Sequence, residues 1–292
     1  MSKTDELRLD VRKMYKLYIN GAFVRSESGR SDPIWDGETF AANVARASRK
    51  DVRDAVVAAR AAQIRWSNLT PANRGLILYR LAEMLEARRH EFLLRLREGA
   101  GASKIEATRE IDATIDRTVW YAGWCDKYAA LLSSRNPVSG PHLNLSAPEP
   151  MGVVAVVLPD RPALLALVST LLPPLVAGNA IVALASERDP RTAVTFSEAL
   201  ATSDLPGGAL NLLTGLRDEL VPTLAKHMDI DAIELNAQDP LRTMLEIEAS
   251  HNVKRVRLRD DHNTDWYGEA AQSLERIERY CEIKTIWHPA GI

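Results

Sequence analysis

The hydrophobic pattern changes its period near the middle of the chain. Between about residues 51 and 129, apolar residues recur every three or four positions, which predicts amphipathic helices. Ser48 with Asp51, and Ser103 with Glu106, resemble the capping pairs that open helices. The long helix after Ser103 is expected to bury one stripe, formed by Ile111, Ile115, Val119, Ala122, Cys125 and Ala129.

From Gly152 onward, short apolar runs alternate with helical segments. Near-continuous apolar runs are typical of parallel strands that are covered on both faces. Strands are expected at 152–158, 180–185, 209–214, 231–235 and 253–258, with helices near 163–177, 191–203, 218–226 and 240–250. This alternation predicts an α/β fold with a doubly wound parallel sheet.

Three other segments are rich in polar and turn-forming residues. Asn20–Gly21 lies inside a predicted strand pair, because both residues tolerate positive φ. The Pro- and Ser-rich stretch after Asn136 predicts an exposed two-stranded excursion. After the polar residues 259–268, a helix and a closing strand are expected.

These patterns divide the chain into four parts. The expectation is a mobile or loosely docked N-terminal arm over 1–16 and one α/β domain built from 17–130 and 150–268. A β-arm is expected from 131–149 and 282–292, with a C-terminal helix over 269–281.

Composition narrows the class of protein. With 292 residues, 46% hydrophobic and 26% charged, the chain has the makeup of an ordinary globular protein. A net charge of -2 does not favour nucleic acid as a partner, and no apolar run predicts a membrane span. The charged N-terminus has no signal-peptide core, and two cysteines make no disulfide framework, so a cytoplasmic location is expected.

Several segments, in this order, resemble the NAD(P)-dependent aldehyde dehydrogenase family. They are YINGAFV, DVRDAVVAARAAQIRWSNLTPANRGLILYRLAEMLE, EPMGVVAVVLP, LVAGNAIVALASE, LPGGALNLLTG and YCEIKTIW. The resemblance implies a Rossmann-like cofactor domain and a β-arm that pairs with the catalytic-domain sheet of a neighbouring subunit. It also implies a catalytic domain with a cysteine nucleophile between about Arg259 and the tail, and we expect this domain to be absent.

The cofactor motifs of the family are altered. The turn whose Asn donates to the substrate oxyanion is Pro159–Pro162 here, and a carboxylate at Asp160 is expected to repel an oxyanion. Leu184 replaces the Lys that holds the adenosine ribose, which leaves Glu187 as a ribose partner. Ala237 replaces the Gly that faces the pyrophosphate, and Asp239 adds negative charge at the same helix start.

The catalytic motif is altered as well. The family segment whose Glu activates water is replaced by residues 259–263, and Arg259 cannot act as a general base. Neither Cys125 nor Cys281 has a neighbouring cation that would lower a thiol pKa. Asp260, Asp261 and His262 are not expected to bind a metal. Lys254, Arg255, Arg257 and Arg259 are expected to form a solvated strand edge or an interface rim rather than a nucleic-acid site.

The leading hypothesis is a non-catalytic subunit, with a structural or regulatory role, that assembles through its β-arm with a full-length aldehyde dehydrogenase. Its expected interface residues are Leu143, Leu145, Ile283, Thr285 and Trp287. A homodimer that pairs arm to arm is the alternative assembly.

Two other functions stay open. One is a stand-alone NAD(P)-dependent aldehyde oxidoreductase. The other is a nucleotide-binding sensor, in which Glu187, Pro206 and Gly207 would contact an adenosine. Because the cofactor motifs are altered, we expect neither NAD nor NADP to bind.

Overall fold

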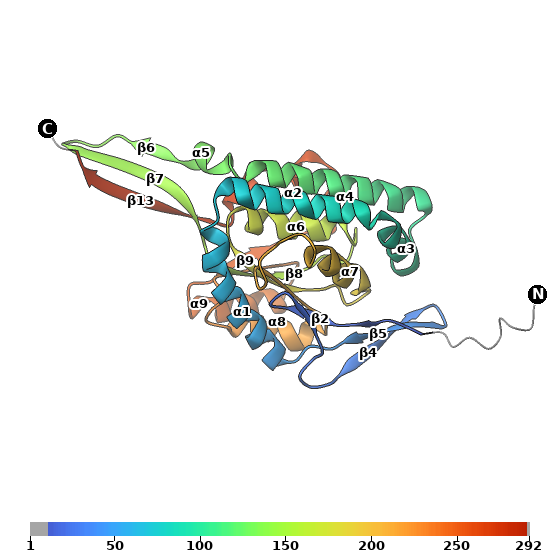
Figure 1. Ribbon diagram of the computed structural model, residues 1–292. Helices are drawn as coiled ribbons and strands as arrows, with labels where there is room; N and C mark the ends of the chain where they lie inside the picture. The colour runs from blue at the N-terminus through green and yellow to red at the C-terminus, as the bar shows by residue number, and fades with distance from the viewer. Residues whose placement is uncertain (1–10, 291–292) are drawn as a thin grey trace, which may run out of the picture.

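The structure is a computed structural model that describes residues 11–290 (Figure 1). Of the predicted N-terminal arm, residues 1–10 lie outside the described residues. Met14–Tyr15, however, forms strand β1, which pairs in parallel with β5 (Thr39–Ala45). The prediction of a loosely docked arm is therefore wrong for this stretch, because its backbone belongs to a sheet.

A seven-stranded sheet forms the centre of the molecule, in the order β12-β11-β8-β9-β10-β2-β3. All five predicted parallel strands are confirmed: β8 (Val153–Val157), β9 (Ala180–Leu184), β10 (Leu210–Leu213), β11 (Ala232–Leu235) and β12 (Arg255–Leu258). Two antiparallel strands, β2 (Leu17–Ile19) and β3 (Ala22–Val24), extend one edge. The turn between them has positive φ at Asn20 and Gly21, as predicted.

Helices cover both faces of this sheet, which confirms the doubly wound α/β fold (Figure 1). One face is covered by α2 (Pro71–Ala87), α3 (Arg89–Gly99), α4 (Lys104–Trp124), α6 (Leu165–Val176) and α7 (Arg191–Leu200). The other face is covered by α1 (Arg49–Ser67), α8 (Arg217–Lys226) and α9 (Leu241–Ser250). Both predicted capping boxes are present, at the starts of α1 and α4.

The buried face of α4 differs from the predicted stripe. Val119 is 40% exposed, whereas Glu110, Thr114, Arg117 and Thr118 are buried. Steps of four residues rotate by about 40° around a helix of 3.6 residues per turn, so the predicted stripe drifts off the core-facing side. The helix buries a row of polar side chains, and these side chains hold other segments.

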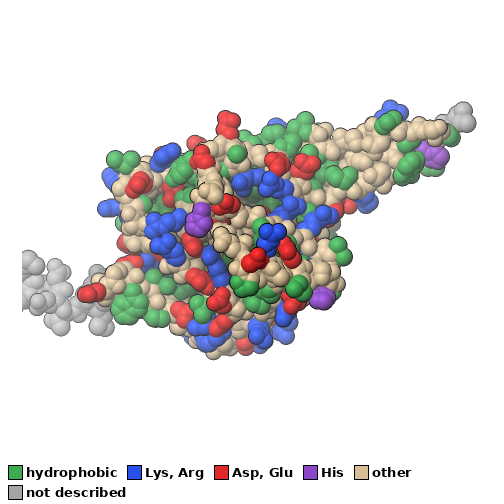
Figure 2. Space-filling model, turned by 180° about the vertical axis from the view of Figure 1, so that it is seen from behind, with side chains coloured by type: hydrophobic (Ala, Val, Ile, Leu, Met, Phe, Trp, Pro, Cys, Tyr) green, Lys and Arg blue, Asp and Glu red, His purple; other side chains and the backbone are tan. Residues whose placement is uncertain are grey.

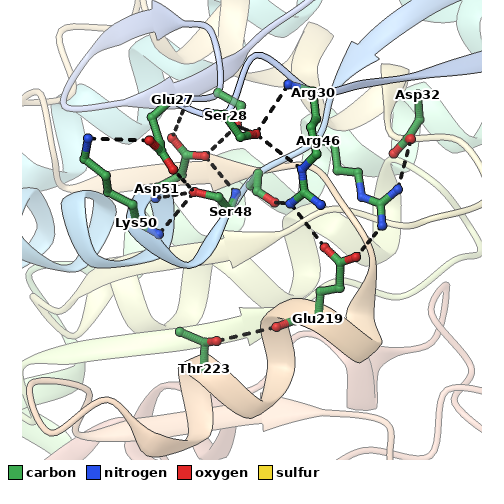
Figure 3. Close-up of polar contacts among 12 residues, drawn as sticks. Glu27, Ser28, Arg30, Asp32, Arg46, Ser48, Lys50, Asp51, Glu219 and Thr223 are labelled. Carbon is green, nitrogen blue, oxygen red and sulfur yellow. Dashed lines mark hydrogen bonds and ion pairs between the residues drawn. The ribbon is translucent and has the colours of Figure 1, made fainter.

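A second hairpin, β4 (Ser31–Asp36) with β5, is tied to the body by charged side chains (Figure 3). Glu219, in the first turn of α8, receives hydrogen bonds from Arg30 and Arg46 on either side of the hairpin. Asp51 completes the α1 capping box and also accepts from the hydroxyl of Ser26 at 2.8 Å. These contacts fix the hairpin against the starts of two helices.

The predicted β-arm is a three-stranded sheet in the order β13-β7-β6, and it projects away from the body (Figure 1). Its strands are β6 (Ser134–Asn136), β7 (His142–Pro150) and β13 (Cys281–Pro289), and the short helix α5 (Tyr128–Leu132) precedes them. β7 and β13 pair in antiparallel register over nine residues, from Cys281 opposite Pro150 to Pro289 opposite His142. Residues 291–292 of the predicted arm lie outside the described residues.

The predicted C-terminal helix over 269–281 is wrong in extent. The segment contains a 3₁₀ turn (Glu269–Ala271) and a five-residue helix α10 (Leu274–Glu278), and Cys281 already begins β13. The helical periodicity was correct for one face, since Ala271 and Ile277 are fully buried. Polar tertiary contacts, described next, fix the rest of the segment.

Arg117 on α4 binds this segment to the body. Its guanidinium donates to the carbonyl oxygens of Trp266 at 3.0 Å and Ala271 at 2.9 Å, to Gln272 Oε1 at 2.8 Å and to Ser169 Oγ at 2.5 Å. Arg117 is only 3% exposed and forms no ion pair within the described part of the chain. The chain between β12 and β13 is therefore packed onto α4 and α6.

Replacing Arg117 with Met is expected to lower the free energy of unfolding by about 3 kcal/mol or more, because several buried acceptors lose their donor together. Urea denaturation of the variant and the parent chain measures this. The matched control is Arg109→Met on the same helix, whose exposed guanidinium lies 4.3 Å from the Tyr267 ring. The control is expected to cost less than about 1 kcal/mol. Equal losses for the two variants would contradict the anchoring role of Arg117.

Candidate functional site

Ligands of doubly wound folds bind outside the carboxyl ends of the parallel strands. At this edge the ends of β8, β9 and β10 are joined by side chains. Asp160 Oδ1 accepts from Ser186 Oγ at 2.6 Å and from the Arg217 guanidinium at 2.7 Å. Arg217 also donates to the carbonyl oxygen of Leu158 at 2.9 Å. The carboxylate at Asp160 is therefore paired with a cation instead of facing an open oxyanion site.

Glu187, the expected ribose contact, lies at the same edge but is also engaged. Its Oε1 accepts a hydrogen bond from the backbone N–H of Arg217, the first residue of α8. A carboxylate at this position satisfies a free amide and complements the positive end of the helix. The structure thus gives Glu187 a structural contact.

Pro206 and Gly207, the other expected adenosine contacts, lie near the amino ends of the parallel strands, on the opposite side from their carboxyl ends. In the pairing of β9 with β10, Ile181 lies opposite Leu210 and Leu184 opposite Leu213. Gly207 therefore precedes the amino end of β10, whereas Glu187 follows the carboxyl end of β9. The prediction that these residues contact one adenosine is wrong, because the sheet separates them.

Gly207 instead permits close packing on the β2–β3 turn. A Cβ atom built on Gly207 would lie 2.9 Å from the carbonyl oxygen of Asn20. The backbone N–H of Asn20 donates to Asn211 Oδ1 at 2.9 Å, which holds the turn against the amino end of β10. The Pro-Gly pair therefore belongs to the attachment of the hairpin.

The start of α9, where the resemblance implies a pyrophosphate site, carries the carboxylate of Asp239. Asp239 Oδ1 accepts from the hydroxyl of Thr243 at 2.8 Å, across the first turn of the helix. Ala237 packs against the core cluster beneath α8 and α9. An anion approaching this helix end would meet the negative charge of Asp239.

At the end of β12, Arg259 occupies the place expected for a water-activating Glu. It forms ion pairs at 2.9 Å with both Glu234 and Asp261 and donates to the carbonyl oxygen of Val157 at 2.6 Å. Glu234 also accepts from the hydroxyl of Tyr280. Burial opposes the charge of Arg259, but attraction to the two carboxylates outweighs it and raises the pKa of Arg259.

The expectation of a solvated basic edge on β12 is wrong for two of its four residues. The Arg259 side chain is 9% exposed. Lys254 is also buried, and its ammonium donates to the carbonyl oxygens of Ala225 and His227 at 2.9 and 2.8 Å. Burial lowers the pKa of Lys254 to about 8. No group of three potential metal ligands occurs within residues 11–290.

The contacts that sequence reasoning missed join residues that are far apart in the chain. Arg217 reaches Asp160 across 57 positions, and Tyr280 reaches Glu234 across 46. No local spacing signals such a pair. Ser186 lies two residues after the last residue of β9, so its position at the carboxyl ends of the strands was the only available signal.

The five expected interface residues lie together on the arm, divided between its two faces. Residues paired across antiparallel strands share a face, so Ile283, Thr285 and Trp287 lie on one side and Leu143 and Leu145 on the other. Ile286, opposite Leu145, adds to the second face and was missed. The exposed fractions reach 61% for Trp287, 54% for Ile283 and 51% for Ile286.

Comparisons with known proteins agree with the fold and the order of the motifs. Residues 24–259 match the aldehyde dehydrogenase family. The chain is 31% identical over 266 residues to a putative aldehyde dehydrogenase, DhaS, of Bacillus subtilis, covering 88% of this chain and 52% of that protein. It is 29% identical over 252 residues to cytosolic aldehyde dehydrogenase 1 of Elephantulus edwardii, covering 83% and 49%.

Solved structures give the same result. An NAD+ complex of an aldehyde dehydrogenase from Bacillus cereus superposes with a TM-score of 0.79 and 26% identity, over 88% of this chain and 52% of that one. PnpE from Pseudomonas sp. WBC-3 superposes with a TM-score of 0.79 and 27% identity, over 84% and 50%. The chain spans about half the length of these relatives. On the match to residues 24–259, the chain belongs to the aldehyde dehydrogenase family.

Proposed function

We propose that this chain is a non-catalytic subunit that assembles through its β-arm with a full-length aldehyde dehydrogenase, with a structural or regulatory role. The observation that carries the proposal is the arm itself. It projects from the body as a sheet whose β13 edge has no strand neighbour among the described residues. Free strand edges pair readily with other chains, through main-chain hydrogen bonds.

The side chains of the arm favour such an interface. Leu145, Ile283, Ile286 and Trp287 are large hydrophobic residues that are exposed on the two strands. Figure 2 shows hydrophobic side chains on the arm, while acidic and basic side chains are interspersed over the body. Exposed apolar side chains beside an unpaired edge are typical of surfaces that become buried on association.

The hydrogen bonds at the carboxyl ends of the parallel strands support a non-catalytic role. Asp160, Ser186, Glu187 and Arg217 satisfy one another there, so a nucleotide would have to displace hydrogen bonds that the chain already makes. At the end of β12, Arg259 is held between two carboxylates and has no capacity to accept a proton.

The two thiols of the sequence also support it. Cys125 and Cys281 are 1% and 9% exposed, and burial raises the pKa of each thiol to about 12. A nucleophilic cysteine needs the thiolate form, which is scarce at neutral pH for such groups. Both side chains therefore pack as small apolar groups.

Neither thiol of the native chain is expected to react with Ellman's reagent at pH 8, whereas both react after denaturation in guanidinium. Because burial raises both thiol pKa values above the 9.0 of an exposed thiol, the thiols contribute stability below about pH 9 that is lost as the pH rises toward 12. The melting temperature of the parent chain should fall over that range. The melting temperature of Cys125→Ala, compared with its own value at pH 7, should fall by less. Stoichiometric labelling of the native chain would contradict this.

Titration with NAD or NADP, followed by calorimetric heat, is expected to show no saturable binding up to about 1 mM. The reason is the occupied edge of the sheet. A full-length aldehyde dehydrogenase serves as the positive control. A micromolar dissociation constant would favour the nucleotide-sensor function, and aldehyde oxidation by the isolated chain would favour the stand-alone enzyme.

Co-expression with a full-length aldehyde dehydrogenase from the same genome is expected to give one complex on size exclusion. Ile283→Asp, which puts a charge on the exposed face of the arm, is expected to weaken the complex at least about tenfold, or about 1.4 kcal/mol. The matched control is Ile64→Asp, because Ile64 on α1 is 60% exposed against 54% for Ile283.

Separate elution of the two chains at about 10 µM would count against the proposal. Self-association of this chain in the absence of a partner, abolished by Ile283→Asp, would favour the arm-to-arm homodimer instead. Equal effects of the two Asp variants would remove the arm from the interface.

A further inference from the structure

A cavity of about 150 Å³ lies where the end of β12, helix α6 and the segment around α10 meet. Its lining is strongly polar and includes four arginines, Arg257, Arg259, Arg276 and Arg279. Two carboxylates, Glu234 and Asp260, also face it. The lining does not include the residues that hydrogen-bond at the carboxyl ends of β8, β9 and β10, which are Asp160, Ser186, Glu187 and Arg217.

Two of the four arginines are neutralised by carboxylates. Arg259 pairs with Glu234 and Asp261 at 2.9 Å, and its side chain is almost fully buried. Arg279 pairs with Glu275 at 2.5 Å, one helical turn away. Each of these two guanidinium groups therefore has at least one carboxylate in direct contact.

The remaining carboxylate is also engaged. Asp260 accepts from the side-chain amide of Asn263 at 2.6 Å and from the backbone N–H of His262 at 3.2 Å, which closes its own turn. These neutral donors hold Asp260 within its own turn, out of ion-pair contact with Arg257 and Arg276. Within residues 11–290, neither of these arginines forms an ion pair.

Arg257 is the more enclosed of the two. Its Nε atom is buried without a hydrogen-bond partner, and its terminal nitrogen donates to the carbonyl oxygen of Arg279. Its guanidinium lies 5.5 Å from the ring of Tyr280. Burial lowers the pKa of Arg257, which reflects a cation that is desolvated without full compensation.

Arg276 lines the same cavity from α10. Its Nε atom donates to the carbonyl oxygen of Ala270 at 3.0 Å, and its guanidinium lies 5.8 Å from the ring of Trp266. The carbonyl and the ring orient the guanidinium, and neither of them carries a negative charge. An anion in the cavity would contact both guanidinium groups directly, which no carboxylate of residues 11–290 does.

We propose that this cavity is a binding site for a small tetrahedral oxyanion, a phosphate or sulfate group, between Arg257 and Arg276. Arginine presents a planar fork of donors that matches the oxygens of such groups. The volume equals that of about five water molecules, which admits an oxyanion with a short substituent and excludes a dinucleotide. This site is independent of the proposed assembly through the arm, so either can fail without the other.

Isothermal titration of the full chain with sodium phosphate, at constant ionic strength set by sodium chloride, tests the site. Saturable binding of about one phosphate per chain is expected, with a Kd of about 1 mM or tighter. Sulfate is expected to compete with phosphate. Acetate is expected to bind at least about tenfold more weakly, because it carries one charge and two oxygens and so cannot present separate oxygen pairs to both guanidinium groups.

Arg257→Gln and Arg276→Gln are each expected to weaken phosphate binding at least about tenfold. The matched control is Arg53→Gln, which also removes one positive charge but lies on the exposed surface of α1. Its phosphate affinity should equal that of the parent chain. Melting temperatures in chloride establish that the variants are folded.

Three results would overturn the proposal. They are no saturable heat for the parent chain up to about 20 mM phosphate, equal affinity for phosphate and acetate, or retained affinity in both glutamine variants. The comparison of phosphate with chloride on the parent chain does not depend on any variant, so it decides the matter even if a variant fails to fold.

Discussion

A single buried cation, the guanidinium of Arg117, determines how the chain passes from the parallel sheet to the arm. It satisfies two backbone carbonyls and two side chains of the surrounding segments in a place that water does not reach. A buried backbone carbonyl without a donor is costly, so this one residue fixes the path of a segment that has little regular structure. The packing of Trp266 and Ile277 follows from that path.

The root of the arm is fixed by the same means. Asn179, which is fully buried, donates to the carbonyl oxygen of Tyr280 at 2.9 Å. Glu282 forms a bidentate pair with Arg255 on β12, with both oxygens at 2.6 Å. The arm therefore leaves the body in a defined direction, and its free β13 edge is presented in one orientation. Such preorganisation reduces the entropy lost when two subunits associate.

The regular part of the fold could be predicted from the sequence, because its signals are local. Short strand-like runs, of which the first two are almost wholly apolar, identified all five parallel strands, and the capping residues Ser48 and Ser103 located two helix starts. The segment after Arg259 could not be predicted in this way, since distant partners such as Arg117 determine it. Val119 shows a related error, because a pattern of small and apolar residues on α4 concealed a buried polar face.

The candidate site was harder to predict than the fold. The changes at Asp160 and Asp239 and the retained Glu187 were visible in the sequence, but their consequences depend on partners brought together by the sheet. Arg217, for example, turns Asp160 from a free carboxylate into half of an ion pair at 2.7 Å. The adenosine contact predicted for Gly207 is wrong because a Pro-Gly turn does not reveal whether it lies at the amino or the carboxyl ends of the parallel strands.

The central claim is that the arm completes the sheet of another subunit. Hydrogen exchange of the chain, alone and in the presence of a full-length aldehyde dehydrogenase, tests it most directly. The account predicts that amides of β13 gain protection in the complex while those of the central strand β8 stay unchanged. A complex that forms without any gain of protection in β13 would contradict it.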